Sequence, residues 1–208
     1  MLRTNSLAAP RAPRAQRLIL YLEGPQDRAI LRAWAQRLLP ALSRSLFHTS
    51  VILGGRRPAR AVEHFTGAGG ADAGLVGLCV LDRDDGREPL RAEAGAPGLE
   101  FFTWGRRHIE SYLLVPAAIE RSLRAPRGDR RIRRAIDAVL AGAADEAAFG
   151  QIDAKRLFGP AGELPRCVGQ PITAQRVARE IRSDELHADV HRLFERLRIA
   201  SGLSSLPG

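Results

Sequence analysis

Apolar residues in the first half of the chain form short continuous runs without polar alternation, which is typical of strands buried on both faces. The predicted strands cover residues 17–24, 45–55, 75–85 and 98–104. Apolar residues at helical spacing after Pro25 predict a helix over 25–40, and a shorter helix is predicted over 57–65. Strands of this kind, separated by helices, predict a parallel sheet and an α/β fold with about four parallel strands.

The second half of the chain has a helical pattern instead. Its predicted helices cover residues 107–123, 128–149, 172–182 and 184–199. A stretch rich in glycine and proline, 159–171, interrupts them. The sequence therefore predicts an α/β core over 17–115, followed by an α-helical C-terminal part over 116–208 that packs on the core.

Residues 1–16 contain arginines but no acid, and we interpret them as a flexible basic tail; a transit peptide is the alternative. No run approaches the roughly 18 apolar residues of a membrane span, so no membrane association is expected. Cys79 and Cys167 lack the spacing of a disulfide framework or a zinc site. This cysteine usage predicts a reduced, cytoplasmic protein.

The charge of the chain points to a polyanionic partner such as DNA or RNA, because 32 Lys and Arg against 23 Asp and Glu give a net charge of +9. Only 5% of residues are aromatic, which favours phosphate contacts over base stacking as the main binding mode. The candidate phosphate contacts are Arg56, Arg57, Arg106 and Arg107. For the pair that follows Gly55, a simple turn is the alternative.

Carboxylates follow two of the predicted strands. Glu23 ends the first strand, and Asp82 and Asp84 end the third. The carboxyl edge of a parallel sheet is where ligands bind, and acids gathered there need a cation to stay ionised together. Hard oxygen ligands suit Mg²⁺ or Mn²⁺. The alternative is that the Asp82 segment is only a polar turn, and that Asp27 only favours the positive end of a helix dipole.

Two further candidates lie in the helical half. Glu110 is followed directly by the apolar residues of "SYLL", which places it beside a buried stripe, although it could simply pair with Arg106 one helical turn away. Lys155 is the only lysine among the 32 cationic residues of the chain. Its ammonium is a compact charge that arginine does not replace, while chance survival in an arginine-rich chain is the alternative.

These residues carry a family resemblance. The motifs "LEGPQD" at 22–27, "LDRDD" at 81–85 and "RRHIESYLL" at 106–114 resemble the toprim domain of overcoming-lysogenization-defect (OLD) nucleases, including the stand-alone toprim effectors of anti-phage systems. The resemblance covers about residues 17–160. It implies a Rossmann-like toprim fold and metal-dependent cleavage of nucleic acid phosphodiesters.

The resemblance also implies roles for the matched positions, with two Mg²⁺ or Mn²⁺ ions as cofactors. The implied metal ligands are Glu23, Asp27, Asp82, Asp84 and Glu110, and the implied catalytic residues are Glu23 and Lys155. His108 departs from the family pattern, where an acid is expected, and Ser111 replaces a common asparagine.

A toprim nuclease that acts as a defence effector is therefore the expected function. The chain has no Gly-Lys-Ser/Thr phosphate loop, so any ATPase is expected to be a separate ABC-type partner. A homodimer is left open. One alternative is a non-catalytic nucleic-acid-binding or adaptor module on the same fold, and a weaker one is primase- or topoisomerase-like chemistry, for which Tyr21 and Tyr112 are poor nucleophiles.

Overall fold

The computed structural model describes residues 17–83, 95–124, 130–142, 145–159 and 161–203. Four parallel strands form one sheet in the order β2-β1-β3-β4. Their bounds are β1 Arg17–Leu22, β2 Val51–Ile52, β3 Leu75–Leu81 and β4 Leu99–Thr103. This confirms the predicted α/β class with four parallel strands, followed by a helical C-terminal part.

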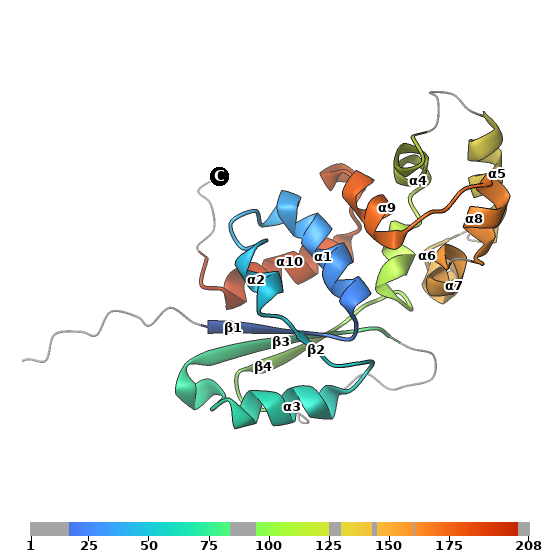
Figure 1. The fold of residues 1–208 in the computed structure, drawn as a ribbon. Helices are drawn as coiled ribbons and strands as arrows, with labels where there is room; N and C mark the ends of the chain where they lie inside the picture. The colour runs from blue at the N-terminus through green and yellow to red at the C-terminus, as the bar shows by residue number, and fades with distance from the viewer. Residues whose placement is uncertain (1–16, 84–94, 125–129, 143–144, 160, 204–208) are drawn as a thin grey trace, which may run out of the picture.

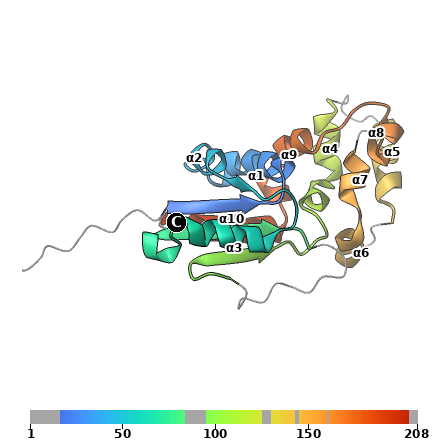
Figure 2. The same cartoon turned by 60° about the horizontal axis from the view of Figure 1, so that its bottom comes forward.

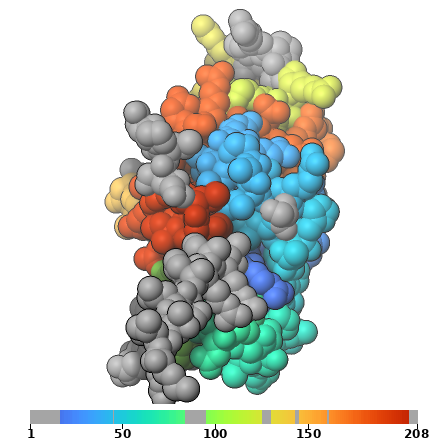
Figure 3. Space-filling view, turned by 90° about the vertical axis from the view of Figure 1, so that its left-hand side faces the viewer, coloured from blue at the N-terminus to red at the C-terminus, as the bar shows by residue number. Residues whose placement is uncertain are grey.

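Helices cover both faces of the sheet (Figure 1). One face packs against α1 Pro25–Leu38, α2 Ser45–His48 and α10 Ala188–Ala200, and the other against α3 Pro58–Gly67. Successive residues of β1 alternate between these layers: Leu20 and Leu22 belong to the larger core cluster, and Tyr21 belongs to the cluster under α3. Figure 3 shows the end of the molecule opposite the carboxyl edge, where α10 lies beside α1.

The remaining helices gather beyond the carboxyl ends of the strands (Figures 1 and 2). They are α4 Pro116–Ser122, α5 Arg130–Leu140, α6 Glu146–Gln151, α7 Ala154–Phe158, α8 Glu163–Val168 and α9 Ala174–Glu180. Single 3-10 turns are η1 Ala71–Ala73, η3 Ile109–Leu113 and η4 Ser183–Glu185. Because α9 packs against α1, the core cluster extends from the sheet into the helical half. No helix in the described ranges is long and apolar enough to cross a membrane.

Several predicted elements differ in detail from the structure. The strand predicted over 45–55 is instead the helical turn α2 and the two-residue strand β2. Leu46 and Phe47 belong to this helical turn, and their side chains are buried in the core. The helix predicted over 107–123 divides into η3 and α4, because Pro116 has no N–H to continue the earlier turn and starts a new helix instead.

The other differences lie further along the helical half. The helix predicted over 128–149 divides into α5 and α6, and the Asp145 side chain caps α6 by accepting a hydrogen bond from the Ala148 backbone N–H. The interrupting stretch 159–171 contains a short helix, α8, which packs against α5 and α7. Lys155 lies on α7, an element that the sequence pattern did not predict.

Candidate active site

Glu23 and Asp82 meet at the carboxyl edge of the sheet. Their strands are direct neighbours, and Leu22 pairs in register with Val80. Glu23 Oε1 accepts a hydrogen bond of 2.7 Å from the Asp82 backbone N–H, and both side chains are buried. The first two predicted carboxylates therefore lie together, whereas Asp84 lies outside the described residues.

The backbone of Glu23 is held by a glycine turn. The N–H groups of Gly54 and Gly55 donate to the Glu23 carbonyl at 3.0 and 2.9 Å. Both glycines have positive φ, +75° and +110°, which L side chains rarely adopt. The pair after β2 is thus a turn, and it directs the chain that carries Arg56 and Arg57 past the site.

The Asp82 carboxylate is held from two sides. Oδ1 accepts the Ile109 backbone N–H at 3.1 Å, and Oδ2 is 2.5 Å from Lys155 Nζ. Asp82 is 2% exposed, whereas the Lys155 side chain is 44% exposed. The ammonium therefore reaches a buried carboxylate from a partly open position.

The charge of Lys155 is favoured by its surroundings. Burial lowers the pKa of the ammonium, but the hydrogen bond and charge of Asp82, with the charges of Glu110 and Asp27, outweigh burial and raise it. Lys155 is therefore a cation at neutral pH.

The position of Lys155 depends on α7 and on the turn before it. Asp153 caps α7 by accepting the Arg156 N–H at 3.1 Å, and Ala154 is buried in the core. Just upstream, the Gly150 carbonyl accepts the Arg107 backbone N–H at 3.1 Å and Arg83 Nη2 at 2.9 Å. These bonds hold the start of the Lys155 segment against the chain that follows β3 and β4.

Asp27 is buried in the first turn of α1. Its Oδ2 accepts the Gly24 backbone N–H at 2.9 Å, so Asp27 also serves the start of the helix. Burial, followed by repulsion from Asp82, raises the pKa of Asp27 to about 6, against the lowering effects of the Gly24 hydrogen bond and Lys155.

Glu110 is the most deeply buried of the site acids, at 1% exposure. Its Oε1 accepts a hydrogen bond of 2.7 Å from Gln26 Nε2, and Oε2 is buried without a hydrogen-bond partner among the described residues. Burial raises the pKa of Glu110 to about 7; Lys155 opposes this shift, and Asp82 and Asp27 add to it. Gln26 was assigned no role from the sequence, although this residue lies inside the "EGPQD" motif.

His108 is a second residue of the site that the sequence did not assign a role. Its Nδ1 is buried, lies 3.9 Å from Asp153 Oδ1 and has no hydrogen-bond partner in the described part of the chain. Burial and then Lys155 lower the pKa of the imidazole, while Asp82 and Asp153 act in the opposite direction. Because its pKa is lowered, the imidazole is neutral at pH values above the ordinary pKa of histidine.

The four candidate arginines occupy different surroundings. Arg56 donates to the Asp82 carbonyl, Arg57 is exposed, and the Arg107 backbone joins the Gly150 turn. Arg106 is only 12% exposed, and its guanidinium forms two bonds to Glu146, at 2.8 and 2.7 Å. The alternative pairing of Arg106 with Glu110 is wrong, since a partner 40 residues away takes its place.

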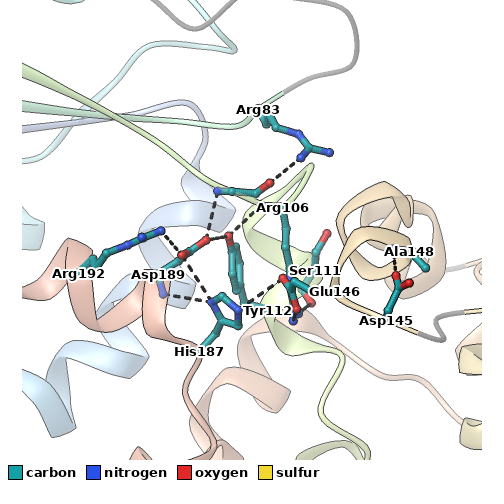
Figure 4. Close-up of polar contacts among 11 residues, drawn as sticks. Arg83, Arg106, Ser111, Tyr112, Asp145, Glu146, Ala148, His187, Asp189 and Arg192 are labelled. Carbon is teal, nitrogen blue, oxygen red and sulfur yellow. Dashed lines mark hydrogen bonds and ion pairs between the residues drawn. The ribbon is translucent and has the colours of Figure 1, made fainter.

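A polar network ties the segment before Glu110 to the C-terminal helix (Figure 4). The Tyr112 hydroxyl donates to Asp189 Oδ2 at 2.5 Å and accepts the Arg106 backbone N–H at 2.9 Å. His187 Nδ1 accepts the Asp189 N–H at 3.1 Å, and its Nε2 lies 3.4 Å from Glu146. The network fixes the chain between β4 and η3, and it contains none of the candidate metal ligands.

Three of the predicted acids, Glu23, Asp27 and Glu110, border one open cleft of about 510 Å³ together with Lys155. It is lined by Glu23, Gln26, Asp27, Gly54, Glu110 and Lys155, among others. Carboxylate oxygens are suitable ligands for a hard divalent cation. Glu110 Oε2, which has no hydrogen-bond partner among the described residues, could be one of these ligands. Within the described ranges, however, no three Asp, Glu, His or Cys side chains converge closely enough to hold a metal. The donors are present without a preformed coordination shell.

Comparison with known proteins supports the fold. No protein-family model and no curated protein matches the sequence. Among solved structures, the chain is similar to the C-terminal region of the Burkholderia pseudomallei OLD protein, with a TM-score of 0.54 and 20% sequence identity. The similarity covers 89% of this chain and 98% of that one. At this identity the likeness shows the fold alone: the chain shares the fold of that C-terminal region.

Proposed function

We propose that this chain is a metal-dependent nuclease of the toprim type, which hydrolyses phosphodiester bonds of DNA or RNA with Mg²⁺ or Mn²⁺. The observation that carries the proposal is the ion pair of Asp82 with Lys155 at the carboxyl edge of the sheet, beside Glu23. Acids that can bind a cation, next to an ammonium that can meet a phosphate, suit an anionic substrate. The net charge of +9 favours the same class of partner.

The cations would be held by the buried acids at the carboxyl edge of the sheet. Glu23, Asp27 and Glu110 line the cleft, Asp82 contacts Glu23 and Lys155 beside it, and Asp84 is a further candidate outside the described residues. When bound, two divalent cations supply water activation and charge stabilisation in phosphodiester hydrolysis. Because the acids do not yet converge, we propose that cation binding draws their side chains together.

Lys155 and Glu23 are the proposed catalytic residues. The Lys155 ammonium sits at the end of a flexible, partly exposed stem, so it can turn from Asp82 towards a phosphate that enters the cleft. Its charge stabilises the extra negative charge of the phosphoryl transition state. Glu23 borders the same cleft, where we propose that it holds a cation or accepts a proton.

The proposed nucleic-acid surface consists of Arg56, Arg57 and Arg107. Arg56 and Arg57 follow the glycine turn that borders the cleft, and Arg107 stands three residues before Glu110. Arg106 is left out of this surface because Glu146 and the Ser111 carbonyl already occupy its guanidinium.

We further propose that the nuclease is a defence effector that acts with a separate ABC-type ATPase. The proposal rests on the resemblance of the motifs at 22–27, 81–85 and 106–114 to the stand-alone toprim effectors. Mixing the purified chain with such an ATPase tests it. Cleavage that changes with added ATP supports the partnership, and cleavage indifferent to both ATPase and ATP contradicts it.

The nuclease proposal is tested with plasmid, single-stranded DNA and transfer RNA, each incubated with Mg²⁺, Mn²⁺ or chelator. We expect metal-dependent cleavage of at least one substrate, abolished by Asp82→Ala. Asp72→Asn is the matched control, because Asp72 is exposed on η1, away from the cleft. No metal-dependent cleavage of any substrate, with or without the ATPase, would overturn the proposal.

A second candidate function is a nucleic-acid-binding or adaptor module without catalysis. Two observations favour it: Lys155 already forms an ion pair with Asp82, and no three acids in the described ranges converge. Under this alternative, salt-sensitive binding persists in Asp82→Ala and no variant or metal produces cleavage.

A further inference from the structure

A second cavity of about 400 Å³ opens beside the acidic cleft and shares two of its residues, Gln26 and Lys155. Its other walls come from α7, α8 and the start of α9. They are formed by Phe158, Pro165, Pro171, Ile172, Thr173 and Ala174. The two cavities therefore adjoin at Gln26 and Lys155; acids line the first, and mainly apolar groups line the second.

The apolar cavity is part of the packed structure. Phe158, Ile172 and Ala174 belong to the main core cluster, so the floor of the cavity is anchored from behind. Thr173 caps α9 by accepting the Arg176 N–H at 3.3 Å, which fixes the start of that helix. Prolines at 165 and 171 stiffen two other walls. The shape of the cavity is thus largely set before any ligand enters.

The cavity combines two kinds of chemistry. An ammonium and an amide stand on the side shared with the acidic cleft, and a phenyl ring with aliphatic groups forms the remainder. A nucleotide has a similar division, with an anionic phosphate at one end and, at the other, a flat base whose faces pack against apolar groups. The volume is within the range of cavities that bind small organic ligands, so a single base can be accommodated.

We propose that this apolar cavity binds one unpaired nucleobase next to the phosphate that Lys155 contacts. The proposal rests on the proposed nuclease function, since it places the scissile phosphate at the shared lysine. A base inside a duplex is stacked and paired and cannot enter, so the site selects single strands, frayed ends or flipped nucleotides. The substrate class is therefore unpaired nucleic acid, held by one base in addition to its phosphates.

A binding experiment tests the cavity without requiring cleavage. A single-stranded oligonucleotide carrying 2-aminopurine is titrated with protein in chelator, and its fluorescence is followed. We expect a fluorescence change with the wild-type chain, and we expect Ala174→Phe, which fills the cavity, to abolish it and weaken binding about tenfold. Gln175→Phe is the matched control, because it adds the same ring at an exposed neighbouring position. Equal fluorescence changes in both variants would overturn the proposal.

A second measurement uses the wild-type chain, so it does not depend on how a variant folds. One abasic position is moved along a single-stranded oligonucleotide, and the cleavage rate of each bond is recorded with Mg²⁺. We expect about tenfold slower cleavage of the bond whose neighbouring base is missing, and slower cleavage of blunt duplex. If the cleavage rate does not depend on the abasic position, the base-binding proposal is overturned and the nuclease proposal still holds. If nothing is cleaved the nuclease proposal fails, and the 2-aminopurine titration still decides the cavity.

Discussion

Lys155 Nζ lies 2.5 Å from Asp82 Oδ2, although 73 residues separate the two along the chain. The contact joins the only lysine of the protein to a carboxylate at the end of the central strand β3. A buried carboxylate that loses its cationic partner is left uncompensated, so the pair binds the helical half to the sheet edge. The same ammonium borders both the acidic cleft and the apolar cavity.

The buried acids predict that stability of the metal-free protein falls as pH rises. The pKa of Asp27 is raised from 3.8 to about 6, and that of Glu110 from 4.5 to about 7. Between these ordinary and raised values the folded state binds more protons than the unfolded chain, so the free energy of unfolding decreases with pH. Each acid contributes on the order of 3 kcal/mol to this decrease.

Urea unfolding in chelator at a series of pH values measures this effect. Asp27→Asn and Glu110→Gln should each flatten the dependence, and the exposed control Asp72→Asn should leave it as in the wild type. Comparison with the variants separates the two acids from other groups that titrate. The prediction requires that burial raises the pKa of Glu110 in the folded state. If the free energy of unfolding depends on pH in the same way in wild type and Glu110→Gln, the prediction is contradicted.

Divalent cations should bind and stabilise the protein, and more strongly at high pH. A cation must displace the protons that Asp27 and Glu110 hold near neutral pH, so affinity should rise between about pH 6 and pH 8. Calorimetric titration with Mg²⁺ and thermal unfolding at several Mg²⁺ concentrations both report binding without any substrate. Glu110→Gln should weaken binding at least tenfold, and binding equal to that of the wild type would remove Glu110 from the ligand set.

Arg57 and Arg106 should have different roles, the first in nucleic-acid binding and the second in stability. Arg57 is exposed beside the glycine turn, so Arg57→Gln should weaken nucleic-acid binding and reduce the salt slope by about 1. Arg106 is committed to Glu146, so Arg106→Gln should lower the free energy of unfolding by about 1 to 3 kcal/mol and leave the salt slope unchanged. Binding isotherms at several salt concentrations, paired with urea unfolding, distinguish the two. A reduced salt slope in Arg106→Gln would return that residue to the binding surface.

The sheet and its acidic edge could be predicted from the sequence because both depend on local patterns. Uninterrupted apolar runs identify buried strands, and neighbouring parallel strands bring their carboxyl ends together, which places Glu23 beside Asp82. The strand predicted around Val51 was too long, since the apolar residues Leu46 and Phe47 serve a helical turn equally well.

The approach of Lys155 to Asp82 could not be derived from periodicity. It depends on α7, a helix of five residues, and on the Gly150 carbonyl, which receives donors from Arg83 and Arg107. Contacts of this kind join segments far apart in sequence and leave no local signal. The bond between Gln26 and Glu110 is similar, since only the fold brings the first turn of α1 to η3.

The central claim is tested most directly by the rate of Mg²⁺-dependent cleavage by Lys155→Arg under single-turnover conditions with saturating nucleic acid. We predict a rate at least about 100-fold below that of the wild type, with the nucleic-acid affinity retained, because a guanidinium does not place its charge where the ammonium does. Arg156→Lys, the reverse exchange at the next position of α7, should cut at the wild-type rate. Cleavage by Lys155→Arg at the wild-type rate would contradict the account.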